Sequence, residues 1–165
     1  MISYITGDIF VAKVPKQTLK AWEPFWDCVT ILFEFQNSDI DDEHPEWRLH
    51  WVAGIALLRT IGHVLVKADA PLSQTHKRAV DSLWADWKDN ATDNAIFWNF
   101  IETERNNLLK TYTFGATLKQ DGESFIVRYT DGEDALQLYR EAVYWWRHQL
   151  NRLEQLLTQD LTARR

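Results

Sequence analysis

The residues best suited to chemistry lie close together in one helical segment. They are Arg105, Asn106, Lys110 and Tyr112. A guanidinium group at such a position must find hydrogen-bond acceptors, and it can stabilise negative charge. At roughly 100° per residue, Arg105 borders the apolar face of this helix instead of pointing away from it. It could alternatively cover the core with its stem and pair with Glu102 or with a carboxylate of a neighbouring helix.

This spacing resembles the signature of HEPN domains, in which an Arg and a polar residue precede a His, with a Tyr two positions later in one branch. Arg105 and Asn106 match the first two positions and Tyr112 matches the last, whereas Lys110 stands where the family has His. The resemblance spans about eight residues and the helical architecture. It implies a helical bundle, commonly homodimeric, and a metal-independent RNase of RNA metabolism or defence.

The lysine in place of histidine implies weak or lost cleavage. RNA cleavage by this route needs a group that accepts a proton from a 2′-hydroxyl near neutral pH, where histidine titrates and lysine is normally protonated. Lys110 and Arg105 could still stabilise negative charge at the phosphorus. The two residues lie roughly 140° apart on an ideal helix. We therefore expect a two-fold homodimer to gather two copies of the motif.

A second candidate pair is Arg59 and His63, which share one helical face because they are four residues apart. If His63 faces Arg105, it could supply the titrating group that Lys110 does not. The alternative interpretation is a helix contact at Gly62, with His63 hydrogen-bonded at the edge of the core.

Other site chemistries have little support in the sequence. Glu46 and His50 have a spacing that can hold a metal on one helical face, but no matching pair follows elsewhere, so we expect no metal. Cys28 is the one cysteine and sits among apolar residues, which indicates a small buried hydrophobe and a reducing compartment. The six glycines form no phosphate-binding loop, and we expect no cofactor.

The chain is acidic, with a formal net charge of −6 and a pI near 5.3. This balance argues against general nucleic-acid binding but allows a local basic site. The N-terminus lacks the features of a signal peptide, and charges interrupt every apolar run before it reaches the roughly 18 residues of a spanning helix. We expect a cytoplasmic protein that does not bind membranes.

Helical periodicity predicts five helices, at about 16–36, 45–67, 74–88, 94–112 and 134–158. An extended arm is expected at 2–13. Nine tryptophans should dominate the core, and the inward residues should include Trp26, Phe33, Tyr112 and Leu156.

A hairpin at about 115–130 is indicated by two short β-prone runs around Asp121-Gly122. Thr130 and Glu133 have the spacing of a capping box for the last helix. The sum is a single, mainly all-α domain covering 1–165: a five-helix antiparallel bundle with one small β-hairpin before the last helix.

Three functions fit these features. The first is a HEPN-like protein of RNA metabolism or defence. The second is a noncatalytic module that binds a partner protein through its aromatic faces or the hairpin edge. The third is a bundle that binds a small ligand in an aromatic pocket anchored by Arg105.

Overall fold

The computed structural model describes residues 16–38, 40 and 46–163, so the predicted arm at 2–13 lies outside it. The fold is mainly helical, with a two-stranded antiparallel hairpin before the last helix, as predicted. The helices are α2 (Trp22–Asn37), α3 (Glu46–Val64), α4 (Gln74–Asp89), α5 (Thr103–Thr111) and α6 (Ala135–Ala163). The strands are β1 (Thr117–Asp121) and β2 (Ser124–Arg128).

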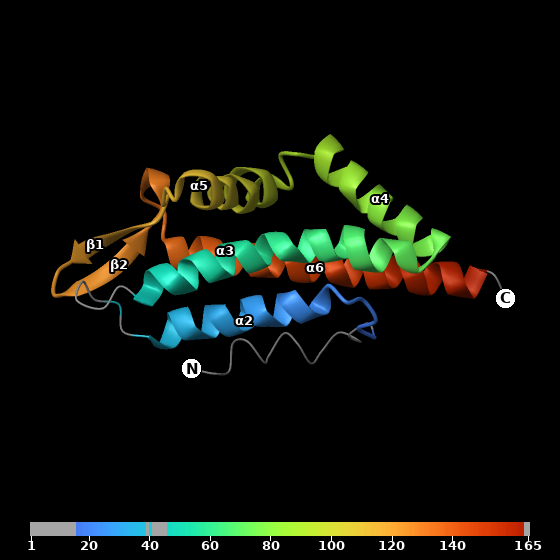
Figure 1. Ribbon diagram of the computed structural model, residues 1–165, viewed down its shortest axis with the longest axis horizontal. Coiled ribbons are helices and arrows are strands. Elements are labelled where there is room, and N and C mark those ends of the chain that lie inside the picture. The colour runs from blue at the N-terminus through green and yellow to red at the C-terminus, as the bar shows by residue number, and fades with distance from the viewer. Residues whose placement is uncertain (1–15, 39, 41–45, 164–165) are drawn as a thin grey trace.

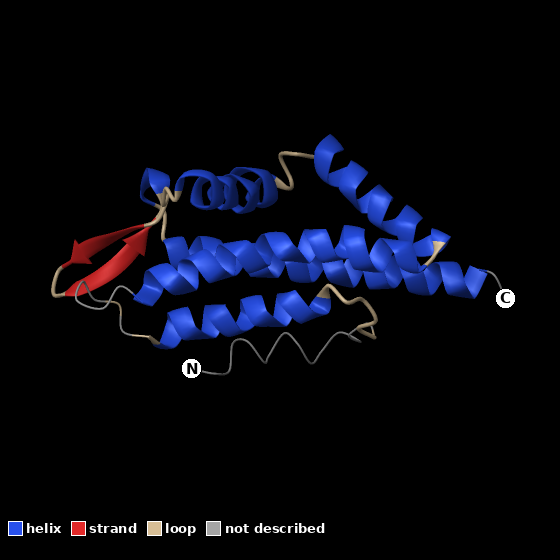
Figure 2. Cartoon of the chain, viewed as in Figure 1, coloured by secondary structure: helices blue, strands red, loops and turns tan. Residues whose placement is uncertain are grey.

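Helices α2, α3 and α6 lie side by side and form the long body of the molecule (Figure 1). Helices α4 and α5 cover the side of this body opposite α2, and the hairpin projects from one end (Figure 2). α2 and α3 are antiparallel neighbours, whereas α3 and α6 run in the same direction. The reason is that α4 and α5 follow one another in the return direction, so that the chain enters α6 at the end where α3 began.

Short π and 3-10 segments refine the predicted helix ends. A π turn, η1 (Leu65–Asp69), and a 3-10 turn, η2 (Ala70–Leu72), prolong α3 beyond the expected end at 67. Ser73 then caps α4, because its Oγ accepts the backbone N–H of His76 at 3.2 Å. The predicted fourth helix is a seven-residue π segment, η3 (Ile96–Glu102), followed by α5.

The first helix begins at Trp22, six residues later than the sequence pattern predicts. Two buried carboxylates accept the backbone N–H groups of the turn that precedes the helix. Asp69 bonds to the amides of Lys20 and Ala21, at 2.7 and 3.0 Å, and Glu154 bonds to the amide of Leu19 at 3.0 Å. These acceptors come from η1 and α6, so no local pattern could have located the helix start.

The capping box predicted at Thr130 and Glu133 is wrong. Residues Thr130–Gly132 form a 3-10 turn, η4, and the cap of α6 is Asp134, whose Oδ1 accepts the N–H of Gln137 at 3.1 Å. The hairpin turn is centred on Gly122 and Glu123, because Asp121 pairs with Ser124 in the strands. Gly122 has a φ of +63°, a conformation that favours glycine.

Tryptophan side chains from several helices form the core, and most of their indole N–H groups find a buried acceptor. Trp51 donates to Glu104 at 2.8 Å, Trp87 to Gln149 at 3.0 Å and Trp22 to Glu154 at 3.0 Å. An unpaired indole N–H in an apolar core is costly, which explains why carboxylates and amides are buried here.

Several apolar residues expected to face the core are on the surface. They are Trp26, Phe33, Tyr112 and Leu156. Trp26 and Phe33 belong to α2, whose buried face is narrower than the run of aromatic residues suggests, and Tyr112 stands where α5 ends.

The expectation that charges break every apolar run was too strict. The continuous helix Glu46–Leu72, which includes α3, is long and apolar enough to cross a membrane by length and composition alone. A core helix passes the same test, and α3 packs against α2, α5 and α6 with Trp51, Ile55, Leu58 and Ile61 buried.

Candidate functional site

Arg105 lies on α5, half-buried, and its Nη1 donates to Oδ1 of the adjacent Asn106 at 2.9 Å. The expected partner, Glu102, is instead paired with Arg59 of α3. Among the described residues, no carboxylate forms an ion pair with Arg105. Its positive charge is therefore not neutralised by a direct partner in this part of the chain.

His63 lies on α3 and senses the charge of Arg105. Partial burial is the main cause that lowers the pKa of His63 from its ordinary value, and the cations Arg59 and Arg105 lower it further, whereas Glu102 opposes them. A histidine with a lowered pKa is neutral at pH 7 and can accept a proton. The structure thus brings His63 and Arg105 into one electrostatic cluster across the contact between α3 and α5.

Arg59 is held more tightly than its neighbours in this cluster. Its Nε bonds to Oε2 of Glu102, and its guanidinium carbon lies 5.8 Å from the ring centre of Trp84. Its buried Nη1 has no hydrogen-bond partner among the described residues. A Cβ at Gly62 would lie 3.2 Å from this Nη1 and 3.3 Å from Trp146, so Gly62 permits the close helix contact expected there.

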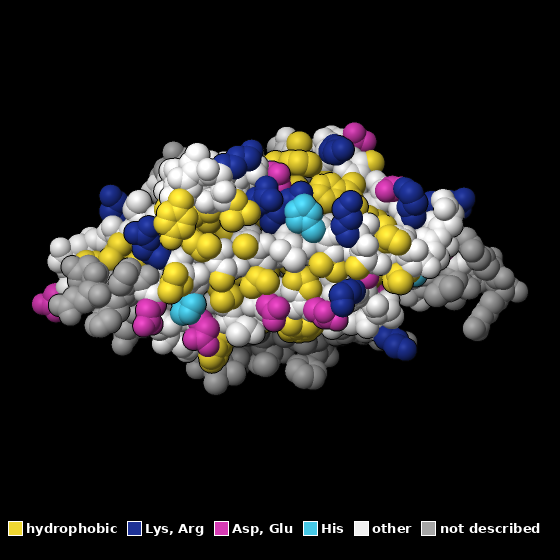
Figure 3. Space-filling view, in the orientation of Figure 1, with side chains coloured by type: hydrophobic (Ala, Val, Ile, Leu, Met, Phe, Trp, Pro, Cys, Tyr) yellow, Lys and Arg dark blue, Asp and Glu magenta, His cyan; other side chains and the backbone are white. Residues whose placement is uncertain are grey.

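The cations of α3 extend this cluster along the helix. Arg59 and His63 lie about 20° and 60° around the helix axis from Arg48, and Lys67 follows one turn later in η1. We call Arg48, Arg59, His63, Lys67 and Arg105 the cationic stripe. Figure 3 shows a histidine ring with Lys and Arg side chains on either side on this face, while acidic side chains gather below them over α2.

Lys110 and Tyr112 do not join Arg105 and His63 within one chain. Lys110 is exposed and lies about 140° around α5 from Arg105. Tyr112 caps the helix C-terminus with 62% of its surface exposed, and its ring packs edge-on against Phe114 at 5.1 Å. Arg48 lies over the other ring of this pair, 4.4 Å from the centre of Phe114.

Glu104, beside Arg105, is a residue that the sequence reasoning missed. It is fully buried and accepts hydrogen bonds from Trp51 Nε1 at 2.8 Å, from the Gly115 amide at 3.0 Å and from Tyr129 Oη at 3.3 Å. It thereby ties α5 to α3 and to the loop before the hairpin. The available signal was that a core tryptophan needs an acceptor and that Glu104 falls on the inner face of the helix.

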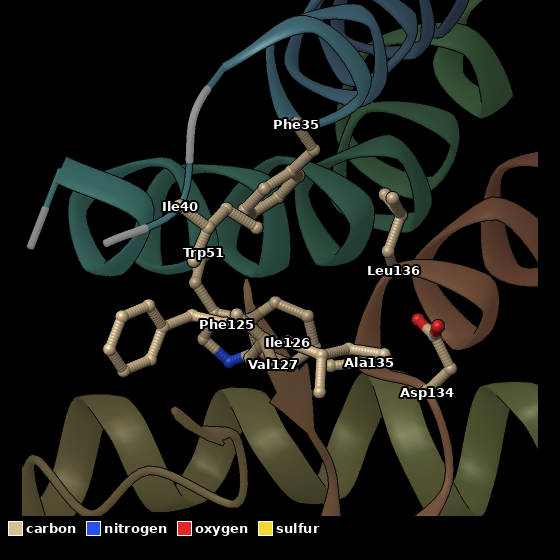
Figure 4. A pocket seen from close by; sticks show the side chains of 9 residues that line it. All are labelled: Phe35, Ile40, Trp51, Phe125, Ile126, Val127, Asp134, Ala135 and Leu136. Carbon is tan, nitrogen blue, oxygen red and sulfur yellow. The ribbon is translucent and has the colours of Figure 1, made fainter. Parts of the chain in front are cut away.

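Arg105 lines neither of two cavities in the described part of the chain. One, of about 210 Å³, is mostly apolar and lies between α2, α3, β2 and the start of α6, with Asp134 as its single charged residue (Figure 4). The other, of about 540 Å³, is a wider groove between η3, α5 and α6. Neither cavity is therefore the expected ligand pocket anchored by Arg105.

The described residues contain neither a cluster of metal ligands nor a reactive thiol. No three side chains of His, Cys, Asp or Glu gather there as metal ligands. Cys28 is fully buried, and burial is the main cause that raises the pKa of its thiol to about 12. A thiol of this kind is a poor nucleophile at neutral pH.

Comparisons of the chain with protein-family models, with curated proteins and with solved structures give no match. The features of this chain that bear on its function are the cationic stripe and the motif around Arg105.

Proposed function

We propose that this chain binds RNA along the cationic stripe, as a HEPN-like protein of RNA metabolism or defence whose metal-independent RNase activity is weak or lost. The observation that carries the proposal is that α3 and α5 pack against each other and that the charges of Arg59, Arg105 and Lys67 all act on His63. His63 and Arg105 both stood out in the sequence, on helices far apart along the chain.

The stripe is a local concentration of positive charge in a protein with a net charge of −6. Arg59 is offset by Glu102, but Arg48, Lys67 and Arg105 form no ion pair with any described residue. Acidic residues elsewhere repel a polyanion, so RNA would be steered to this face. Arginine and lysine at a groove or ridge are the groups that hold a phosphate backbone.

The same cluster contains the groups for a simple cleavage step. Neutral His63 would accept the proton of an RNA 2′-hydroxyl, and the 2′-oxygen would attack the adjacent phosphorus. The bond from phosphorus to the 5′-oxygen would break, that oxygen taking a proton from water, to leave a 2′,3′-cyclic phosphate and a 5′-hydroxyl. Arg105 would stabilise the charge that builds on the phosphate oxygens.

Two features indicate that cleavage of RNA by this site would be weak. Lys110 occupies the position where HEPN domains carry His, and it is exposed and turned away from Arg105. His63 comes from another helix, and no described residue holds its ring by a hydrogen bond. A homodimer that juxtaposes two α5 helices would bring Lys110 of one copy toward the stripe of the other.

Binding and cleavage of a labelled RNA, measured as a function of salt, test the proposal. We expect Arg105→Ala to weaken binding roughly tenfold, because a charge-assisted hydrogen bond is lost. Lys119→Ala, an exposed lysine of β1, is the matched control and should leave binding unchanged. A 2′-deoxy oligonucleotide should bind without being cut, and Lys110→His should increase cleavage of RNA.

The outcomes separate the two parts of the proposal. Failure of the wild-type protein to bind RNA at low salt, or equal losses in Arg105→Ala and Lys119→Ala, would refute the RNA-binding site. Binding with no cleavage in either the wild type or Lys110→His would remove the nuclease part. Sedimentation of the same samples gives the oligomeric state.

The hairpin supports one alternative, a module that binds a partner protein. β1 and β2 pair with each other as a two-stranded sheet, and most of β1 is exposed. An extended segment of a partner could add to the outer edge of β1. Replacing Leu118 by Pro would block such pairing without touching the cationic stripe.

A further inference from the structure

Tyr112 adopts a backbone conformation that side chains rarely take. Its φ and ψ are 51° and 38°, and it is the one residue other than glycine with a positive φ among the described residues. Its N–H closes α5 by bonding to the Leu108 carbonyl at 3.0 Å. Helix ends of this left-handed kind usually carry glycine. The helix end therefore does not explain why an aromatic residue stands here.

The ring of Tyr112 is not used to fill the core. It is 62% exposed, and it packs edge-on against the ring of Phe114. Phe114 in turn lies between Arg48 at 4.4 Å and Trp47 at 6.4 Å. Tyr112, Phe114 and Arg48 together form a surface group of two rings and a guanidinium, which we call the aromatic platform.

The aromatic platform lies at one end of the cationic stripe. Arg48 belongs to both, and Tyr112 caps the C-terminus of α5, the helix that carries Arg105 seven residues earlier. Along α3, Arg48 and His63 are about 22 Å apart at 1.5 Å per residue. At the 3.4 Å rise per nucleotide of one strand in a duplex, this length corresponds to about seven nucleotides.

We infer that the ring of Tyr112 stacks on an unpaired nucleobase and thereby makes single-stranded RNA the preferred ligand of this face. Exposed aromatic rings beside cations bind single strands because every base has a flat face that can stack. The bases of a duplex are already stacked on one another. A duplex would therefore contact the cations of the stripe, but its bases would not stack on the aromatic platform. The inference rests on the proposed RNA binding.

The experiment compares the binding of decauridine with that of a blunt duplex of the same length to variants at Tyr112. We expect Tyr112→Gly to weaken decauridine binding roughly tenfold and to leave duplex binding unchanged. Tyr112→Phe should bind decauridine like the wild type. Tyr144→Ala, which removes an exposed tyrosine of α6, is the matched control and should change neither affinity.

Thermal unfolding of the same variants distinguishes a binding role from a structural one. Glycine is favoured at this φ, so Tyr112→Gly should keep the melting temperature or raise it by up to about 3 °C. Weaker single-strand binding in an equally stable protein would support the platform. A clear drop in melting temperature, repeated in Tyr112→Asn, would show that the ring is structural and overturn the inference.

The binding measurements distinguish an error in the role given to Tyr112 from an error in the proposed RNA binding. Unchanged decauridine binding in Tyr112→Gly, with a loss of both ligands in Arg105→Ala, would overturn the platform and keep the cationic stripe. Binding of neither ligand by the wild-type protein would overturn both.

Discussion

Replacing Glu104 by alanine tests whether the tryptophan-rich core depends on its buried acceptors. The substitution leaves the Trp51 N–H and the Gly115 N–H without an acceptor, and Trp51 is 1% exposed. Each buried donor without a partner costs about 1–3 kcal/mol. Tyr129 Oη would also lose its bond to Glu104, at a smaller cost because this residue is only half-buried.

We therefore expect Glu104→Ala to reduce the free energy of unfolding by about 4 kcal/mol, a large part of the stability of an ordinary domain. For a chain of this size the melting temperature should fall by about 8–16 °C. Urea unfolding followed by circular dichroism gives the free energy, and a thermal scan gives the temperature. Glu104→Gln keeps one acceptor oxygen for Trp51 and Gly115, so its loss should stay below about 1.5 kcal/mol.

The reasoning would be refuted if Glu104→Ala stays within about 1 kcal/mol of the wild type. It would also be refuted if Glu104→Gln is as damaging as Glu104→Ala, since the charge and not the acceptor would then matter. Glu123→Ala, at the exposed hairpin turn, is the control and should change the stability by less than about 0.5 kcal/mol.

Three further predictions follow from contacts and pKa directions. Gly54→Ala places a Cβ 2.6 Å from a ring carbon of buried Tyr139, and overpacking of this kind should cost about 1–3 kcal/mol in urea unfolding. Cys28, with a thiol pKa raised to about 12, should react with Ellman's reagent only after the protein is denatured, and rapid reaction of the native protein would contradict its burial. The pKa of His63, measured by NMR, should lie below 6.5 and rise in Arg105→Ala. Because the unfolded chain binds this proton more tightly, His63 should reduce stability as the pH falls below about 6.5, and His63→Gln should abolish that loss.

The motif around Arg105 illustrates what local spacing can and cannot predict. The spacing placed Arg105 at the border of the apolar face, and the structure shows it half-buried there. It did not reveal that Glu102 would be taken by Arg59, because that pair joins residues 43 positions apart. Glu104 and Arg105 are neighbours in sequence, yet one is fully buried and the other is not, since successive helical residues point in different directions.

Periodicity predicted the helices and the hairpin correctly because the spacing of apolar residues and the turn glycine are local properties. Helix ends were less predictable: Trp22 starts α2 because Asp69 and Glu154, from distant segments, hold the preceding amides. The capping box failed because Asp134 offered a better placed acceptor.

The mainly helical class, the hairpin and the identity of the residues around Arg105 follow from local patterns in the chain. Tertiary structure alone decided which of these residues meet: it placed His63 of α3 within the field of Arg105, left Lys110 exposed and set the ring of Tyr112 on the surface beside Phe114. The physical reason is that a helical pattern specifies the face on which a side chain lies, whereas its partner across the interface depends on how the helices pack.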